Sequence, residues 1–488
     1  MVTEVYEAVI GLEIHAELLT DSKMFCGCRV VDSVTAPPNT AVCPVCLGMP
    51  GMLPVLNQRA VEFAMRVALA LHCTIQTRSV FARKNYFYPD LPKGYQISQY
   101  ELPLATGGWL DIPSDDGKMR RIRVRRVHLE EDTGKLTHLE NGQGSLVDYN
   151  RSGVPLLEIV SEPDMRSAKE ARAYAAKVRQ ILRYLGVNAG DMEKGVIRFE
   201  ANVSVRPPGT SALGTRTEVK NLNSFRALAA AIDYEIARQS AHVAQGGEVV
   251  QDTMGWSESR QETFSQRGKE EAHDYRYFPE PDLPPLQISP DWIADVEATL
   301  PELPDAKRVR YVNELGLSAY EAAILTEDRQ TAVWFEAALT ASGEPTTVAN
   351  WMLNILFSQM NETGQTIDAI KVNPGDLVEL IKLVEEGTIN ANTAKEVLAE
   401  MFSSGRPATE IVEAQGLAQI SDETRLNALI AQILAENPSQ VESYLGGKEG
   451  LRGWFIGQVM RATQGKANPQ LVNRLLAAQL AALKQTRQ

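Results

Sequence analysis

The sequence predicts an α+β protein in which a strand-rich N-terminal half precedes a helical C-terminal half. Apolar and polar residues alternate with a period of two in residues 6–18, 118–132 and 196–206, which is the spacing of strands with one buried face. From about Ser289 onward, amphipathic runs with helical spacing replace this alternation. The 488 residues correspond to about three domains, at roughly 150 residues each.

The composition is typical of a globular protein. Hydrophobic residues make up 44% of the chain, which is enough for substantial cores. The net charge of −13 gives no general attraction to nucleic acid, so an RNA partner would have to meet local basic patches. The N-terminus lacks a basic segment followed by a long apolar run, and no stretch of about 18 uncharged apolar residues occurs. We therefore expect a cytoplasmic protein.

The first predicted strand, residues 6–18, places three polar side chains on one face. Glu13, His15 and Glu17 alternate with Leu12, Ile14 and Ala16, which would face the core. Carboxylate and imidazole ligands spaced about 7 Å apart along a strand suit a divalent cation that receives further ligands from other elements. The alternative is a strand face that simply meets solvent.

Four of the five cysteines are clustered, which does not resemble the disulfide framework of a secreted protein. Cys26 and Cys28 form a C-x-C pair, and Cys43 and Cys46 form a C-x-x-C pair after fourteen intervening residues. Two such pairs can supply four thiolates in a tetrahedron, so we predict a structural zinc ion with no open position for catalysis. Free thiols or a redox C-x-x-C remain the alternatives.

Two segments of the N-terminal half mix charges in a way that suits nucleotides. Residues 81–100 combine many aromatic rings with Lys84 and Lys93, which can hold a base or an RNA end, although core packing explains the rings almost as well. Residues 118–132 begin with five arginines and end in Glu130, Glu131 and Asp132. This predicts a basic end for phosphates and an acidic end for a cation that bridges them.

Further carboxylates occur in later strands. Glu158 lies within the apolar run 154–160, so it should face an arginine, a metal ion or the site. The predicted strands 196–206 and 215–223 place Glu200 and Glu218 among cations, either as part of a site or as ladders of salt bridges. Neither a P-loop nor a G-x-G-x-x-G pattern occurs, so ATP would have to be held by side chains and a metal ion. The proline-rich segment 260–286 is expected to extend over the site.

Several long motifs in a fixed order resemble the B subunit of the bacterial Asp/Glu-tRNA(Asn/Gln) amidotransferase, the GatB family. They are VIGLEIHAEL, RKNYFYPDLPKGYQISQY, HLEEDTGK, DYNRSGVPLLEIVSEPD, VKNLNSF and DYRYFPEPDLPPL, and the resemblance covers the whole chain. It implies an antiparallel-sheet cradle as the catalytic kinase and transamidase domain over residues 1–292, with the zinc loop at 26–46. Only some members of the family carry the four cysteines, and here they are intact.

The resemblance also implies a reaction. ATP would phosphorylate the side-chain carboxylate of Glu on tRNA(Gln) or Asp on tRNA(Asn), and ammonia from an amidase (A) subunit would then displace the phosphate. A small (C) subunit would complete a heterotrimer, and the misacylating synthetase is a further possible partner. The rival hypothesis is a zinc-stabilised scaffold that binds tRNA without catalysis of its own.

The motifs and strand patterns together define a candidate site for ATP and Mg²⁺. The magnesium ligands predicted here are Glu13, His15, Glu131 and Glu218. The predicted contacts to phosphate or acyl carboxylate are Lys84, Arg151 and Lys220. Four further residues are predicted to lie near the bound cofactor: Glu130, Glu193, Glu200 and Asn202.

The C-terminal half is predicted to contain a helical domain at 293–405 and a small helical tail domain at 406–488. No catalytic pattern occurs there. The family resemblance implies that the tail, which is YqeY-like, contacts the tRNA body. Its glycine-rich segment 446–466 carries a local excess of positive charge, although ordinary surface lysines on a helical tail would look the same. The residues predicted to bind tRNA are Lys448, Arg452, Arg461 and Lys466.

Overall fold

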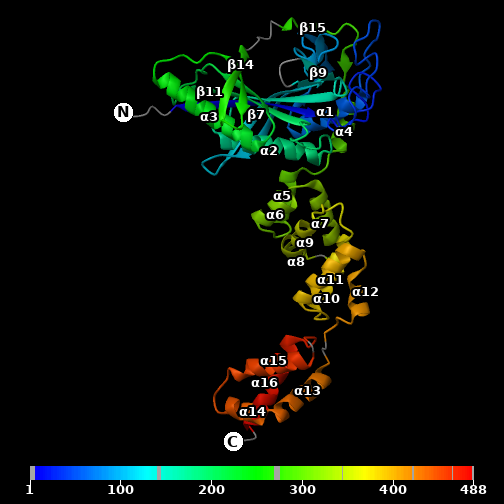
Figure 1. Cartoon of the computed structure of the whole chain (residues 1–488), viewed down its shortest axis with the longest axis vertical. Coiled ribbons are helices and arrows are strands. Elements are labelled where there is room, and N and C mark those ends of the chain that lie inside the picture. Colours follow the sequence, from blue (N-terminus) through cyan, green and yellow to red (C-terminus); the bar gives the residue numbers. More distant parts are fainter. Residues whose placement is uncertain are drawn as a thin grey trace. The chain divides into compact units, whose positions relative to one another are not determined.

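The computed structural model of the chain describes residues 6–139, 144–268, 275–342, 344–419, 422–463 and 465–485. The chain divides into two compact units, Met1–Pro304 and Asp305–Gln488. The first combines sheet and helices, and the described part of the second is helical (Figure 1). This confirms the predicted α+β class. None of the described helices is both long and apolar enough to cross a membrane.

Among the described residues of the first unit, a nine-stranded sheet forms the centre, and β1 (Glu7–Glu17) is its middle strand. All neighbouring strands are antiparallel except β12 and β13, which are parallel. From one edge to the other, the strands around β1 are β14 (Glu262–Gly268), β13 (Asp252–Ser257), β12 (Thr217–Leu222), β11 (Ile197–Arg206), β1, β10 (Pro155–Ser161), β7 (Met119–Glu131), β6 (Ala105–Pro113) and β2 (Thr74–Ile75).

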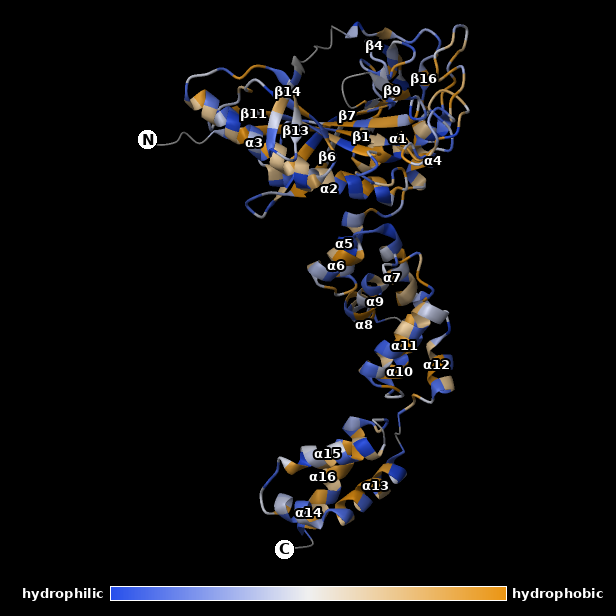
Figure 2. Ribbon diagram, in the orientation of Figure 1, coloured by the Kyte–Doolittle hydropathy of each residue, from blue (hydrophilic) through white to orange (hydrophobic). Residues whose placement is uncertain are grey.

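Helices cover the apolar face of this sheet, and in Figure 1 α2 lies below the strands and α3 lies at the left. Leu12, Ile14 and Ala16 of β1 are at most 1% exposed and belong to the same core as the inner faces of the helices. Full burial of a side chain such as Leu12 stabilises the fold by about 1.5–3 kcal/mol. Buried and partly exposed residues accordingly alternate along β1 from Leu12 to Glu17. Figure 2 shows hydrophobic and hydrophilic residues on the strands and helices of this unit. The helices of this unit are α1 (Gln58–Ala70), α2 (Ala168–Tyr184), α3 (Phe225–Ala244) and α4 (Pro290–Ala298).

Smaller sheets lie on the other side, towards the polar face. β15 (Phe278–Pro279), β4 (Phe81–Asn85) and β5 (Tyr95–Gln99) form one, while β16 (Leu286–Gln287) pairs with β3 (Arg78–Ser79) and β8 (Lys135–His138) pairs with β9 (Ser145–Asp148). β14, β15 and the start of β16 belong to the proline-rich segment 260–286, and β14 is an edge strand of the large sheet. Residues 269–274 lie outside the described part of the chain, and the predicted position of the segment over the site stays a prediction.

The arginines of β7 do not form the open basic face predicted for phosphates. Among the described residues, four of the five guanidinium groups pair with carboxylates, the exception being Arg126. The distances are 3.1 Å for Arg120 with Glu170, 2.9 Å for Arg121 with Asp111, 2.7 Å for Arg123 with Asp164 and 2.8 Å for Arg125 with Glu162. Asp164 and Glu162 follow β10 in the chain, about forty residues away, so local sequence does not reveal the pairing.

Glu235 of α3 is the centre of a buried polar network in the first unit. Its carboxylate has no exposed surface and accepts hydrogen bonds from Arg238, Gln239 and Thr263. Burial alone would raise the pKa of Glu235, but these hydrogen bonds outweigh it and leave the pKa below its usual value.

The second unit contains two separate hydrophobic cores among its described residues. One extends from Tyr311 to Val412 and the other from Leu426 to Leu480. The predicted domain boundaries at 292/293 and 405/406 stay predictions. Helices of the first core are α5 (Pro304–Asn313), α6 (Ala319–Leu325), α7 (Arg329–Ser342), α8 (Pro345–Trp351), a π-helical turn (Met352–Leu356), α9 (Phe357–Thr363), α10 (Pro374–Glu385), α11 (Ala391–Ser404) and α12 (Ala408–Gln415). Those of the second are α13 (Glu423–Glu436), α14 (Pro438–Leu445), α15 (Leu451–Ala462) and α16 (Pro469–Gln485).

Candidate active site

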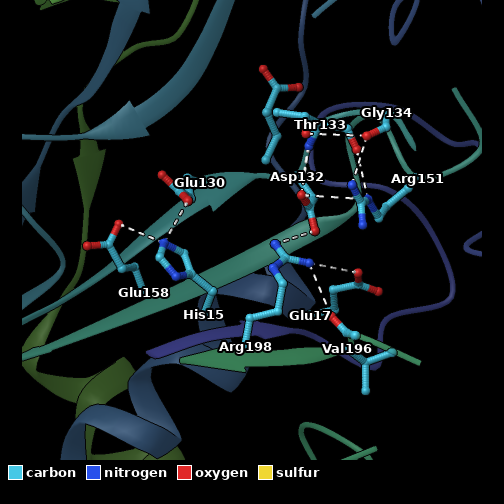
Figure 3. A network of polar contacts seen from close by, with 12 residues as sticks. His15, Glu17, Glu130, Asp132, Thr133, Gly134, Arg151, Glu158, Val196 and Arg198 are labelled. Carbon is cyan, nitrogen blue, oxygen red and sulfur yellow. Dashed lines mark hydrogen bonds and ion pairs between the residues drawn. The ribbon is translucent and has the colours of Figure 1, made fainter. Parts of the chain in front are cut away.

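The polar face of β1 organises the candidate site, because each of its last three polar residues meets a different group of side chains. His15 lies opposite Glu158 of β10, and Glu158 lies opposite His128 of β7. The Nε2 atom of His15 is 3.5 Å from Glu158 and 3.9 Å from Glu130 (Figure 3). The Nε2 atom of His128 is 3.2 Å from Glu158. His15, Glu130 and Glu158 therefore offer three ligand atoms within 4.8 Å of one another.

Protonation in this first cluster is set by its opposite charges. Burial opposes the charged form of His15, but the hydrogen bond to Glu158 and the charges of Glu158, Glu200 and Glu130 raise the pKa of His15 to about 9. Burial likewise opposes ionisation of Glu158, yet His128 and His15 hold its pKa well below the usual range. A metal ion at this cluster would therefore have to replace the proton on His15.

Glu13 belongs to a second cluster on the same face. Glu13, Glu200 of β11 and Glu218 of β12 offer carboxylate oxygens within 4.8 Å of one another. Asn202 donates to Glu13 at 2.9 Å, and its own Oδ1 is buried without a hydrogen-bond partner among the described residues. Lys220 approaches Glu200 at 3.0 Å and Glu218 at 3.9 Å.

This second cluster brings three carboxylates together, and Lys220 balances only part of their charge. Burial and the charges of Glu158, Glu200 and Glu218 raise the pKa of Glu13. Burial opposes ionisation of Glu200 as well, but Lys220 and His15 together outweigh it and lower the pKa of Glu200. A divalent cation would relieve the repulsion, and an all-oxygen donor set suits magnesium. A cavity of about 140 Å³ opens beside Glu13, and its lining includes Arg125, Ser161, Asn202 and Arg216.

Glu131, a predicted magnesium ligand, lies outside both clusters. One of its oxygens is 2.6 Å from Lys93, and the backbone N–H of Ile97 donates to the carboxylate at 2.9 Å. Neighbouring residues on a strand point to opposite faces, so Glu130 joins His15 while Glu131 turns towards β5. Glu131 also lines a cavity of about 220 Å³ together with Lys93 and two of the cysteines, Cys26 and Cys46.

Lys84 lies on β4 in a cage of tyrosines. Its ammonium is 4.7 Å from the ring centre of Tyr275 and 5.7 Å from that of Tyr86, while Tyr277 stacks on Tyr100 at 4.2 Å. Lys84 has no hydrogen-bond acceptor among the described residues, so its charge is available to an anion. Asn85 donates to the carbonyl of Arg276 at 2.9 Å, which fixes the segment that carries two of the rings.

Glu17 anchors a third group, the arginine–carboxylate network shown in Figure 3. Arg198 bridges Asp132 at 2.9 Å and Glu17 at 3.7 Å. Arg151 lies 3.8 Å from Asp132 and donates to the carbonyls of Thr133 and Gly134. Burial alone would raise the pKa of Asp132, but Arg198 and Arg151 lower it to about 2. Burial, with the charge of Asp132, raises the pKa of Glu17 to about 8.

The four clustered cysteines also converge. The sulfur atoms of Cys26, Cys28, Cys43 and Cys46 lie within 4.8 Å of one another, so the group can hold a metal ion. The backbone N–H of Cys43 donates to the Cys46 sulfur at 3.2 Å. Donation from the Cys26 thiol outweighs burial and, with the nearby charge of Lys23, lowers the pKa of Cys46 to about 4. Thiolate donors converging in this way fit zinc.

Comparison with known proteins relates this site to a family. Residues 8–294 match the GatB/GatE catalytic domain, and residues 333–480 match the GatB domain. The chain belongs to the GatB family. The B subunit of the aspartyl/glutamyl-tRNA(Asn/Gln) amidotransferase from Thermodesulfovibrio yellowstonii is 54% identical over 96% of the chain and 98% of that protein. Its counterparts from Geotalea uraniireducens and Geobacter sulfurreducens are each 54% identical over 97% of the chain and 99% of the relative. The predicted family and its amidotransferase class are thereby confirmed.

Other predicted residues of this GatB-family chain lie apart from the two clusters. Glu193 is exposed on the turn before β11. In the second unit, Arg452 donates to Asn473 and Lys466 donates to the carbonyl of Gly416 at 2.8 Å, so both are bound to their own chain. The other two basic residues predicted to bind tRNA are Lys448 and Arg461, and both are exposed.

Several residues of the site are not in the predicted set. The sequence predicts that Glu158 faces an arginine, a metal ion or the site, but it assigns Glu158 no role there. It gives no reason to expect more than an ordinary histidine at His128. The signal that could have found His128 is its period-two spacing from Glu130 on the same predicted strand. Nothing local could have found Arg198 and Asp132 as a pair, because they come from segments 66 residues apart.

Proposed function

We propose that the chain activates the side-chain carboxylate of Glu-tRNA(Gln), of Asp-tRNA(Asn) or of both with ATP, and converts it to the amide as the B subunit of an amidotransferase. Membership of the GatB family and the names of the relatives support the reaction. The observation that carries the proposal is the presence of two acidic clusters on one sheet face, His15–Glu130–Glu158 and Glu13–Glu200–Glu218.

The chemistry explains why such a face is needed. A carboxylate resists attack by ammonia because its oxide is a poor leaving group, and transfer of the γ-phosphoryl group from ATP to that oxygen removes the obstacle. ADP leaves in this first step, and inorganic phosphate leaves when ammonia attacks the acyl phosphate. The protein contributes mainly positioning and charge neutralisation to such a transfer.

Magnesium would be held by the two clusters. Glu13 and Glu218 of the predicted set remain ligands in this proposal, together with Glu200, while His15 acts with Glu130 and Glu158. We assign Glu131 a structural role, because Lys93 and a backbone N–H already occupy its carboxylate. When bound, magnesium supplies positive charge that neutralises the phosphates.

Cations of the chain would complete the phosphate site. Lys84 is the strongest candidate, since its ammonium lies over the rings of Tyr86 and Tyr275 and forms no ion pair within 4 Å in the described part of the chain. Lys220 lies at the edge of the second cluster, where it can contact the phosphate or the acyl carboxylate. Arg151 is also proposed for this role, although its guanidinium already donates to two backbone carbonyls. Asn202 would orient Glu13.

The four-cysteine group would hold a structural zinc ion. Four thiolates fill a tetrahedral shell and leave no position for a reactive water, so this ion would fix the loop 26–46 and take no part in the transfer.

The second unit would bind the tRNA body through its small helical core. Lys448 and Arg461 are the better candidates, because Arg452 and Lys466 bond to their own chain. The domain limits 293–405 and 406–488 are part of this proposal. Two separate hydrophobic cores support a division into two helical parts, but Ala408, Ile411 and Val412 belong to the first core, so the cores separate after Val412 and not at 405/406.

The active enzyme would be a cytoplasmic heterotrimer with an amidase (A) subunit, which supplies ammonia from glutamine, and a small (C) subunit. The name of the relatives is that of one subunit of an amidotransferase. The misacylated tRNA would be the substrate, and the misacylating synthetase a possible further partner.

The test is ADP formation by the purified complex with ATP, Mg²⁺ and either Glu-tRNA(Gln) or Asp-tRNA(Asn). We expect Glu13→Ala and Glu218→Ala to abolish ADP formation that depends on misacylated tRNA, while tRNA still binds. Lys118→Ala is the control, because Lys118 is exposed and directly precedes β7, at the end of the strand away from Glu130. Unchanged ADP formation in both variants would reject the site and favour the scaffold hypothesis.

A further inference from the structure

Lys23 is a fully buried lysine next to the four cysteines. It follows β1 in the chain, and its side chain has no exposed surface. Its ammonium lies 3.6 Å from the sulfur of Cys46 and donates to the carbonyl of Tyr149 at 3.2 Å. A buried ammonium is stable only beside a negative charge. Of these two contacts, the Cys46 sulfur is the one that can carry a negative charge, and it would do so when it binds a metal ion.

The metal site that we propose would provide such a thiolate. Four thiolates around one divalent zinc ion carry a net charge of about −2, which is itself costly to bury. An ammonium that donates to one sulfur offsets part of this charge and holds the ligand in place. Groups that hydrogen-bond to metal ligands, as this ammonium would, contribute strongly to metal affinity.

The second contact of Lys23 reaches a turn that also borders the candidate active site. In the turn 149–153, the carbonyl of Gly153 accepts from the backbone N–H of Met24 at 2.7 Å, and the N–H of Gly153 donates to the carbonyl of Asp132 at 2.9 Å. Gly153 has a φ of 86°, and a Cβ atom there would lie 3.4 Å from the Cβ of Cys46. The turn is therefore packed directly on the cysteine loop.

We propose that Lys23 is a positioning residue that retains the zinc ion and ties the cysteine loop to the turn 149–153. By donating at once to Cys46 and to Tyr149, its ammonium makes the arrangement of this turn depend on an occupied metal site. Arg151, which lies in the same turn, is thereby held against the carbonyls of Thr133 and Gly134. The inference rests on the proposed zinc site, but not on the proposed ATP chemistry.

The test compares Lys23→Met, which keeps the length and removes the charge, with Lys194→Met. Lys194 is a matched control because its ammonium pairs with Asp32 of the cysteine loop at 2.7 Å and is half exposed. Zinc content is measured in the purified complex, and zinc release is followed with a chelator and a chromogenic indicator. We expect Lys23→Met to release zinc about 10-fold faster or more, and Lys194→Met to match the wild type. Release at the wild-type rate in both variants overturns the inference.

A second measurement needs no variant and covers the case in which Lys23→Met fails to fold. Backbone hydrogen exchange is compared in the wild-type complex before and after zinc removal. We expect faster exchange in residues 149–153 after removal, and unchanged exchange there overturns the inference. Wild-type protein that binds no zinc would reject the metal site itself, whereas zinc held equally by the wild type and Lys23→Met rejects only the role of Lys23.

Discussion

Glu130 and Glu131 are neighbours in sequence, yet their exchange for glutamine should have opposite consequences. Glu131→Gln leaves the Lys93 ammonium without its carboxylate in a place where the two side chains are only 11% and 4% exposed. Removing one partner of a buried pair costs about 3–5 kcal/mol, which lowers the melting temperature of a unit of this size by about 5 °C or more. Magnesium affinity should change little.

Glu130→Gln instead removes one negative ligand from the cluster with His15 and Glu158. A unit charge about 4 Å from an ion is worth about 4 kcal/mol at an effective dielectric constant of about 20, and water at the vacated position recovers part of it. We therefore expect Mg²⁺ binding at the cluster of His15, Glu130 and Glu158 to weaken by about 10-fold or more. Stability should change little, because the lost attraction between Glu130 and His15 is offset by relief of the repulsion between Glu130 and Glu158, and glutamine can still bond the hydroxyl of Ser98.

The assay is a calorimetric titration of Mg²⁺ into each full-length variant, paired with thermal unfolding of the same samples. The predicted pattern is lost affinity with normal melting for Glu130→Gln, and lower melting with normal affinity for Glu131→Gln. The opposite pattern, or an equal loss of affinity in both variants, would refute the assignment of the two residues to opposite faces.

Three other changes have defined outcomes. Glu235→Gln should destabilise the chain by about 1–3 kcal/mol at neutral pH, because it loses charged hydrogen bonds. Since the pKa of Glu235 is lowered in the folded chain, this loss of stability should become smaller as the pH falls below about 4.5. Thermal unfolding of the wild type and the variant at pH 7 and pH 4 measures it, and an equal loss at both pH values would contradict the prediction. Lys84→Met should reduce kcat/KM for ATP by about 10-fold or more by removing a phosphate contact, with Lys118→Met as control; equal ATP kinetics in the two variants would exclude that contact. Replacing Lys448 and Arg461 by alanine should weaken tRNA binding and lower the slope of log affinity against log salt by the contribution of about two phosphate contacts. An unchanged slope would mean that tRNA binds elsewhere.

The sequence predicted the parts of the site that depend on local pattern. Period-two alternation correctly placed Glu13 and His15 on one face of a strand whose other face is buried. It could not decide between Glu130 and Glu131, because the face that each residue takes depends on how β7 pairs with β10. The register that aligns His15, Glu158 and His128 across three strands is likewise non-local, and no spacing within one segment encodes it.

Charge pairing shows the same limit. A row of arginines on β7 looks like a phosphate surface until the chain folds and brings Asp164 and Glu162 beside it. The cysteine cluster was easier, since two short pairs with one loop between them leave few arrangements. Local pattern therefore located the site well, while the contacts of individual charged residues required the fold.

Hydroxylamine trapping decides whether this chain makes an acyl phosphate on tRNA. The complex is given ATP, Mg²⁺ and Glu-tRNA(Gln) or Asp-tRNA(Asn) without glutamine or ammonia, and hydroxylamine converts any acyl phosphate into a hydroxamate on the tRNA. We predict side-chain hydroxamate with the wild type and none with Glu13→Ala or Glu218→Ala. Equal hydroxamate in these variants, or none in a wild-type complex that forms amide normally, would contradict the proposed chemistry.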